Sequence, residues 1–301
     1  MDEDIIDKYK LAGKIARKAL IKARDFVSPK KHIDLFELCE YAENVIKSEG
    51  AQLAFPCNSS FNEIAAHYSP IDKDPIEFRE GVLKIDVGAM IDGYIADTAI
   101  SIARGYEYEN MCKINESILK SVLEMMRPGV KLGKIGELIE EEAKINGYKP
   151  ISNLSGHMIR QYELHAGKSV PNVKEIFSPK INADEVYAVE PFLTFSDRKG
   201  SVRSGSEITI YSLKKTKRIK KDKLLDKLKT QIYNERKGLP FSPRWYYKKY
   251  GKDKVLGYMS QLYNMGYLHA YPILIESSNG IVSQFEHTVI ILDNENIITT
   301  I

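Results

Sequence analysis

The segment of residues 82–103 most constrains how this chain folds, because two β-rich runs there flank Asp92-Gly93. Such a dipeptide favours a two-residue hairpin turn. With that turn, Asp86 pairs with position 99 and Asp97 with position 88, so both carboxylates lie on one face, about 7–8 Å apart or less. Two like charges at that spacing repel unless a cation lies between them. The hairpin predicts a metal site; the alternative is two solvated aspartates on an exposed sheet face.

Two pairs of amphipathic helices are predicted around this hairpin. Apolar residues recur at helical spacing over residues 4–27 and 35–46, and again over residues 111–126 and 132–145. Glu37-Leu38-Cys39-Glu40 returns 100 residues later as Glu137-Leu138-Ile139-Glu140. The pattern predicts a helix–helix–sheet unit used twice in an α/β (α+β) fold. Further strands are expected over residues 186–194, 207–213, 271–276 and 285–292.

Length and composition exclude several classes of protein. A chain of 301 residues suits one large or two modest domains. No apolar run approaches the roughly 18–20 residues that span a bilayer, and the acidic start of the chain is unlike a signal peptide. Three cysteines without a C-x-x-C motif predict neither a disulfide framework nor a zinc knuckle. We therefore expect a cytoplasmic protein with no membrane contact, and a monomer.

A strongly basic segment interrupts the later strands. Residues 214–254 hold sixteen Lys and Arg against four Asp and Glu, a local charge of +12 that leaves −9 on the rest of the chain. Residues 212–272 are predicted to be a small helical, winged-helix-like insertion into a catalytic domain of residues 1–211 and 273–301. Its lysines either bind ribosomal RNA or form a solvated helical face. We expect its interleaved aromatics to form the core of the insertion; they are Trp245, Tyr246, Tyr247 and Tyr250.

Further chemistry-bearing side chains stand in apolar surroundings. Two histidines, His157 and His165, lie eight residues apart. Glu190 follows an apolar run, and Glu286 precedes one. Four buried carboxylates and one histidine form an oxygen-rich ligand set that suits two cations such as Mn, Co or Fe. His67 lies in a segment that we expect to be rich in loops, where functional residues concentrate.

In this order and spacing, the residues resemble the methionine aminopeptidases, and the insertion resembles the type II branch in its archaeal form. The resemblance covers nearly the whole chain. It rests on Phe55-Pro56, Ala65-Ala66-His67-Tyr68, Lys84-Ile85-Asp86-Val87-Gly88, His165-Ala166-Gly167, Val189-Glu190-Pro191-Phe192 and Gln284-Phe285-Glu286-His287-Thr288. It implies a pita-bread fold with pseudo-twofold halves, and removal of the initiator methionine from nascent proteins whose second residue is small and uncharged.

The resemblance also implies roles for individual residues. Two divalent metal ions (Co, Mn, Fe, Zn or Ni) would be held by Asp86, Asp97, His157, Glu190 and Glu286, with Asp97 and Glu286 bridging both. A metal-bridged hydroxide would attack the peptide carbonyl, and we expect Glu190 to carry the proton to the leaving amine. His67 and His165 would bind the substrate and stabilise the tetrahedral intermediate. The pocket for the methionine side chain would be lined by Phe55, Leu164, Ile210 and Tyr271.

Two other readings stay open at this stage. A proline-specific enzyme on the same fold would usually carry a large additional N-terminal domain, for which this chain has no room. A non-catalytic member that binds RNA or protein would have lost metal ligands, whereas this chain keeps all five together with both histidines. Metal content after purification would distinguish the enzyme from the binding protein.

Overall fold

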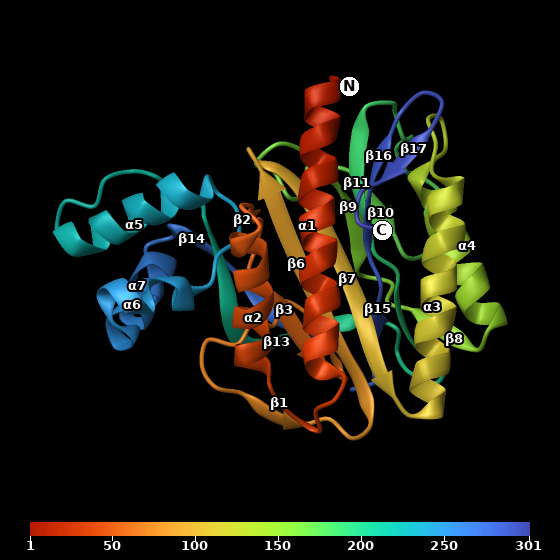
Figure 1. Cartoon of the computed structure of the whole chain (residues 1–301), viewed down its shortest axis with the longest axis horizontal. Helices are drawn as coiled ribbons and strands as arrows, with labels where there is room; N and C mark the ends of the chain where they lie inside the picture. The colour runs from red at the N-terminus through yellow and green to blue at the C-terminus, as the bar shows by residue number, and fades with distance from the viewer.

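Two pairs of long helices cover one face of the central strands in the computed structural model, which describes residues 1–301 (Figure 1). The first pair is α1 (Glu3–Val27) and α2 (Leu35–Ser48), and the second is α3 (Tyr106–Met125) and α4 (Leu132–Ile145). The Asp2 and Asp34 carboxylates accept hydrogen bonds from backbone N–H groups in the first turns of α1 and α2, as N-caps do. The predicted helices are thus confirmed. Only α3 begins earlier, because its first turn is polar and exposed and has no apolar periodicity.

The predicted hairpin forms with the predicted register. Strands β6 (Gly81–Ile91) and β7 (Tyr94–Arg104) pair so that Asp86 faces Ala99 and Asp97 faces Gly88. Asp92 and Gly93 both have positive φ, at 51° and 86°, as a type I′ turn requires. The other edge of β6 pairs with β2 (Gln52–Leu53) and β3 (Asn58–Phe61).

A second antiparallel sheet continues the first and lies beneath α3 and α4 (Figure 1). A backbone bridge between Ala99 of β7 and Glu286 joins the two sheets. Each half therefore presents two helices on a sheet, which is the repeated unit expected from the sequence. The strands of this second sheet, in spatial order, are β10 (Ser169–Pro171), β9 (Ser155–Ile159), β11 (Glu185–Val189), β16 (His287–Ile291) and β17 (Asn296–Ile298).

Two predicted strands are broken at the residues that matter most for chemistry. The run over residues 186–194 divides into β11 and β12 (Phe192–Phe195), because Pro191 has no N–H to continue a ladder and the chain changes sheet there. The run over residues 285–292 divides into β15 (Ser283–Gln284) and β16, and Glu286 between them bridges to β7 instead. The segment around His67 is rich in loops as expected, although the short strands β3 and β4 (Ile64–Ala66) lie within it, and His67 directly follows β4.

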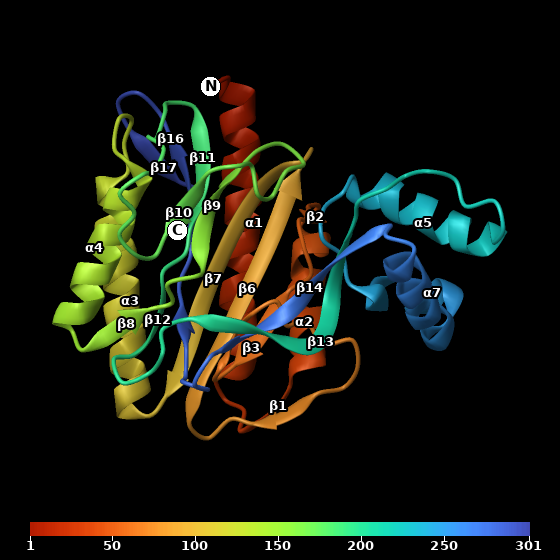
Figure 2. The ribbon, with the colours of Figure 1, turned by 180° about the vertical axis from the view of Figure 1, so that it is seen from behind.

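Long strands β13 (Val202–Leu213) and β14 (Leu268–Glu276) cross the face of the molecule that the four long helices leave open (Figure 2). They pair with each other and, through β14, with β4. Both strands begin earlier than predicted, β13 at Val202 and β14 at Leu268. The remaining short strands are β1 (His32–Asp34), β5 (Pro75–Glu77) and β8 (Tyr148–Pro150).

The basic segment forms a helical unit between β13 and β14, which projects to one side (Figure 1). Its helices are α5 (Lys223–Arg236), the 3₁₀ helix η1 (Pro243–Tyr246), α6 (Tyr247–Tyr250) and α7 (Lys252–Asn264). Tyr246 belongs to the unit's own buried core, and the other three aromatics pack against that core. Ser242 precedes η1, and its side chain makes no cap hydrogen bond. The limits 212–272 for an insertion subdomain stay a prediction.

No helix of the structure combines the length and apolarity that a membrane crossing requires.

Candidate active site

The five predicted metal ligands come from both halves of the fold and meet where the two sheets join. Asp97 Oδ2 lies 3.6 Å from His157 Nε2, and Glu190 Oε1 lies 3.8 Å from the same nitrogen. Asp97, His157 and Glu286 each offer a ligand atom within 4.8 Å of the other two. Asp86 lines the same pocket. The structure therefore brings all five side chains together.

Backbone contacts across the seam fix where these carboxylates point. The Thr288 hydroxyl of β16 accepts from Asp97 N at 2.7 Å and donates to Asp97 O at 2.8 Å. The Thr98 hydroxyl donates to Glu286 O at 2.8 Å, and Glu286 N donates to Ala99 O at 3.0 Å. Both backbones are thus tied to each other, so the side chains of Asp97 and Glu286 project into the same space. Neither threonine can be recognised as a support from the sequence alone.

The carboxylates of this centre are held in an environment that disfavours their charge. Burial raises the pKa of Asp86 to about 7, and burial together with the neighbouring carboxylates raises the pKa of Asp97 and Glu286 well above their ordinary values. Glu190 is shifted the same way, first by burial and then by Asp86. Asp86 Oδ1, Asp97 Oδ1 and Glu286 Oε2 are buried without a hydrogen-bond partner. Buried oxygens of one charge sign without partners fit a divalent cation, which supplies the missing partner and neutralises the charge.

Two further predicted residues lie beside this centre. The ring of His165 is 4.4 Å from that of His157, centroid to centroid. His67 has the left-handed backbone conformation, with φ of 63°, and its ring stands edge-on to Tyr271 at 5.6 Å. Burial lowers the pKa of His67 to about 4 and that of His157 to about 3, so both imidazoles are neutral near pH 7. A neutral imidazole is the form that ligates a metal or donates one hydrogen bond.

The cavity that contains the carboxylates is lined by apolar side chains as well. Phe55, Leu164, Ile210 and Tyr271, the four residues expected to line the pocket for the methionine side chain, all line this cavity. Gly88 of β6 backs the Phe55 ring, and a Cβ at that position would stand 2.2 Å from the ring. A side chain at this position would therefore displace the Phe55 ring.

Sequence reasoning missed four residues that line this cavity. Gln284 Nε2 donates to Glu190 Oε2 at 3.2 Å, and Asn58, Ala66 and Pro240 line the pocket. Gln284 stands two residues before Glu286, inside a segment already singled out, so its position offered a signal. Pro240 comes from the basic segment, and no local pattern places that segment against the pocket.

Comparisons with known proteins agree with this geometry. Residues 7–212 match metallopeptidase family M24. The chain is 43% identical over 309 residues to a methionine aminopeptidase of Saccharolobus solfataricus, covering 100% of this chain and 99% of the relative. It is 41% identical to a methionine aminopeptidase of Methanocaldococcus jannaschii, with complete coverage of both chains.

Solved structures share the fold at low sequence identity. A methionine aminopeptidase from Thermotoga maritima superposes with a TM-score of 0.71 at 19% identity, covering 100% of this chain and 98% of that one. A prolidase from Pyrococcus furiosus superposes with a TM-score of 0.64 at 16% identity, but this chain covers only 64% of it. These likenesses confirm the expected pita-bread fold. Together with the near-complete match to archaeal relatives, they establish that the chain belongs to metallopeptidase family M24, among the methionine aminopeptidases.

Proposed function

We propose that this methionine aminopeptidase holds two divalent cations among its five clustered ligands and uses them to release the initiator methionine of nascent proteins. The observation that supports this most directly is the set of unpartnered buried carboxylate oxygens beside an apolar pocket. An unpaired carboxylate is costly to bury, so four of them in one place need positive charge between them. The apolar pocket next to them accepts an unbranched, uncharged side chain.

We assign the ligands as the family resemblance implies. Asp86 would hold one cation, His157 and Glu190 the other, and Asp97 and Glu286 would lie between the two. Bound divalent cations supply Lewis acidity, which polarises a carbonyl and lowers the pKa of a coordinated water from 15.7 towards roughly 7. Oxygen-rich sites of this kind accept several divalent metals.

The chain's own residues position the substrate and move the proton. Glu190 is proposed to take the proton of the attacking water and deliver it to the leaving amine, with Gln284 orienting its carboxylate through the 3.2 Å hydrogen bond. His67 and His165 would donate hydrogen bonds to the substrate carbonyl as negative charge develops on its oxygen. One such donor is worth about 3–4 kcal/mol in other enzymes.

Specificity at the second residue of the substrate is proposed to be steric. The pocket itself discriminates weakly, because one methylene changes binding by only about 1–3 kcal/mol. A large or charged second side chain would instead meet His67, His165 and the buried centre, where charge is costly. We therefore expect cleavage when that residue is small and uncharged.

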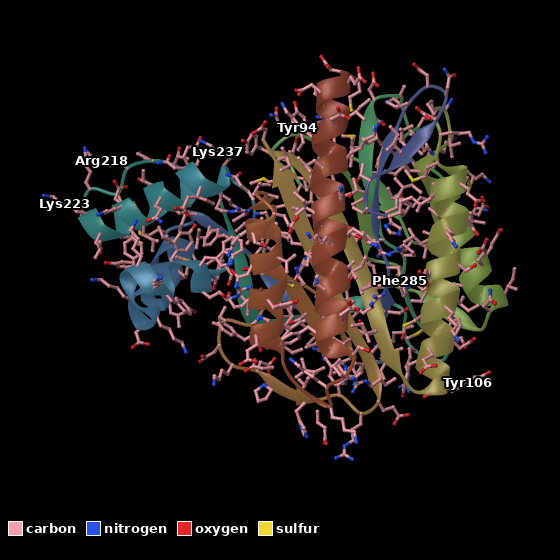
Figure 3. The ribbon with its side chains drawn as sticks, in the orientation of Figure 1. Tyr94, Tyr106, Arg218, Lys223, Lys237 and Phe285 are labelled. Carbon is pink, nitrogen blue, oxygen red and sulfur yellow. The ribbon has the colours of Figure 1, made fainter.

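The basic helical unit supports a second contact, with the ribosome. Of its sixteen lysines and arginines, Lys229, Arg236 and Arg244 are buried and the other thirteen are exposed. Arg218, Lys223 and Lys237 stand out from the surface of this unit (Figure 3). Such a surface suits the phosphate backbone of ribosomal RNA, which would bring a monomeric enzyme in the cytoplasm to its nascent substrates.

Peptide hydrolysis tests the central proposal. Metal-free protein would be incubated with Met-Ala-Ser or Met-Lys-Ser, with added Co²⁺ or Mn²⁺ and with chelator, and released methionine would be measured. We expect metal-dependent release from Met-Ala-Ser alone. Binding of two equivalents of metal, measured by calorimetry on the same sample, is the expected stoichiometry. A folded protein that releases no methionine with any of these ions would overturn the proposal.

A further inference from the structure

Arg236, the last residue of α5, reaches out of the basic unit into the catalytic body. Its side chain is only 5% exposed. Nη1 donates to Leu53 O at 2.8 Å, and Nη2 donates to Ala54 O at 2.7 Å. These carbonyls belong to the two residues immediately before Phe55. A guanidinium thus holds the backbone that leads directly into the wall of the apolar pocket.

The same guanidinium also holds a second segment of the pocket wall. Nη2 donates to Pro240 O at 3.1 Å, and Pro240 lines the pocket with Phe55. The chain reaches Pro240 through a tight turn in which Lys237 and Gly238 have positive φ, at 53° and 96°. Leu239 in this turn packs in one apolar cluster with Phe55 and Leu164. Residues 236–241 therefore form a strap across one end of the pocket.

The strap is tied down at its far end as well. Phe241 exchanges two backbone hydrogen bonds with Tyr211, at 3.0 and 2.7 Å. Tyr211 directly follows Ile210, another residue of the pocket wall. Three walls of the pocket are thus connected through one strap, and Arg236 is the side chain that joins the strap to the body.

From these contacts we propose that Arg236 is a positioning residue for the methionine pocket, acting by clamping Phe55 and Pro240 at a fixed separation. The proposal rests on the proposed function, because it takes this pocket to be the one that receives the methionine side chain. It makes the basic unit part of the specificity apparatus. We expect the clamp to act on substrate recognition and not on the chemical step, since the Arg236 guanidinium bonds the backbone of Leu53, Ala54 and Pro240 and none of the carboxylates.

The test compares Arg236→Met with a matched loss of the other buried arginine of the unit. Arg244 pairs with buried Glu43 and touches no residue of the pocket, so the double variant R244M/E43Q loosens the unit without leaving a lone buried charge. Hydrolysis of Met-Ala-Ser and Leu-Ala-Ser would be measured for each protein together with its thermal unfolding.

We expect R236M to raise the KM for Met-Ala-Ser about tenfold and to lower the preference for methionine over leucine, with kcat changed less than about threefold. Arg236→Lys should recover part of the KM, because its ammonium can still reach one of the carbonyls. R244M/E43Q should lower the unfolding temperature and leave KM and preference at their wild-type values.

Two results would overturn the clamp: a folded R236M with wild-type KM and preference, or an R244M/E43Q that shifts both as much. If R236M does not fold, Pro240→Ala removes one wall directly, and a wild-type KM in that variant would equally reject the proposal. Failure of the proposed function is a separate outcome, because the wild-type protein itself would then release no methionine.

Discussion

Two buried clusters of charged side chains in this molecule are satisfied in opposite ways. At the proposed catalytic centre, four carboxylates converge, and three of their buried oxygens have no hydrogen-bond partner. At the contact between α2 and the basic unit, Glu43 is completely buried, yet both of its oxygens are bonded. We call the second cluster the anchor; it consists of Glu40, Glu43, Ser69, Arg244 and Trp245.

The anchor satisfies its charges internally. Arg244 donates to Glu43 Oε1 and Oε2 at 2.6 and 3.0 Å, and also to Glu40 and the Ser69 hydroxyl. Trp245 Nε1 adds a bond to Glu43 Oε2 at 2.8 Å. Cationic and anionic groups are matched in bidentate geometry, which is the arrangement that offsets the cost of burial.

The difference teaches which buried charges serve stability and which serve function. A cluster that is already satisfied needs no ligand, so changing it should cost folding free energy and little activity. An unsatisfied cluster opposes folding until a cation binds, so changing it should cost activity and little stability. Four variants, each with its control, test this contrast.

The largest expected effect is on activity at the unsatisfied centre. Glu190→Gln should lower kcat/KM for Met-Ala-Ser by about 10²–10⁴-fold, because it removes both a proton carrier and an anionic ligand. Methionine release under saturating metal measures this loss. Asp197→Asn, an exposed acid in the loop after β12, is the control and should keep full activity. Retention of more than a tenth of wild-type activity in E190Q would show that Glu190 does not move the proton.

The next largest effect is on stability at the anchor. Arg244→Met should lower the free energy of unfolding by about 3–5 kcal/mol, because Glu43 would be left buried without its partner. Urea unfolding measures the loss, and kcat/KM per folded molecule should stay within about threefold of wild type. R244M/E43Q should be more stable than R244M and less stable than wild type. Equal loss in the single and double variants would mean that packing, and not charge pairing, holds the anchor.

More of the proposed catalytic centre than of the anchor could be predicted from the sequence, and the reason is physical. Asp86 and Asp97 lie in one hairpin, so a two-residue turn and strand alternation were enough to place both on one face. Glu190, Glu286 and His157 were grouped with them from their apolar surroundings alone, and no local rule placed them in space, because their convergence depends on how two sheets join at Ala99 and Glu286.

The contacts between the basic unit and the body could not be predicted by any local rule. Arg236 reaches carbonyls 183 and 182 residues away, and Arg244 reaches a carboxylate 201 residues away. In the sequence both arginines look like two more charges in a basic run. The end of β11 before Pro191 could be partly predicted, since a proline inside an apolar run argues against one continuous strand.

A pH titration sharpens the contrast in the metal-free protein. The folded-state pKa of Asp86 is raised to about 7, whereas an unfolded aspartate titrates near 4. The folded protein therefore holds a proton that the unfolded chain releases, and the contribution of Asp86 to stability is lost as pH rises from about 4 to about 7. The amide side chain in the variant Asp86→Asn does not titrate. The free energy of unfolding of wild type should therefore fall relative to that of D86N as the pH rises over that range.

Urea unfolding with chelator at pH 4.5, 6 and 7.5 measures this difference. At pH 7.5, a saturating concentration of divalent cation should make wild type more stable than D86N, since wild type keeps a proposed metal ligand that D86N lacks. A difference between the two proteins that does not change with pH would mean that Asp86 is solvated and that its burial is unimportant.

The smallest expected effect on catalysis lies at the outer surface of the basic unit. R218E/K223E reverses two exposed charges at the surface of the basic unit (Figure 3), outside the anchor and the carboxylate centre, so tripeptide hydrolysis should stay within about twofold and stability within about 0.5 kcal/mol. Co-sedimentation with ribosomes at low salt should fall, because phosphate contacts of this kind weaken steeply as counterions compete. K10E/K14E makes the same charge change on the exposed face of α1 and should leave co-sedimentation intact. An equal loss of co-sedimentation in both variants would mean that only the net charge of the protein matters. Co-sedimentation that changes with neither variant nor with salt would mean that the basic unit does not bind the ribosome.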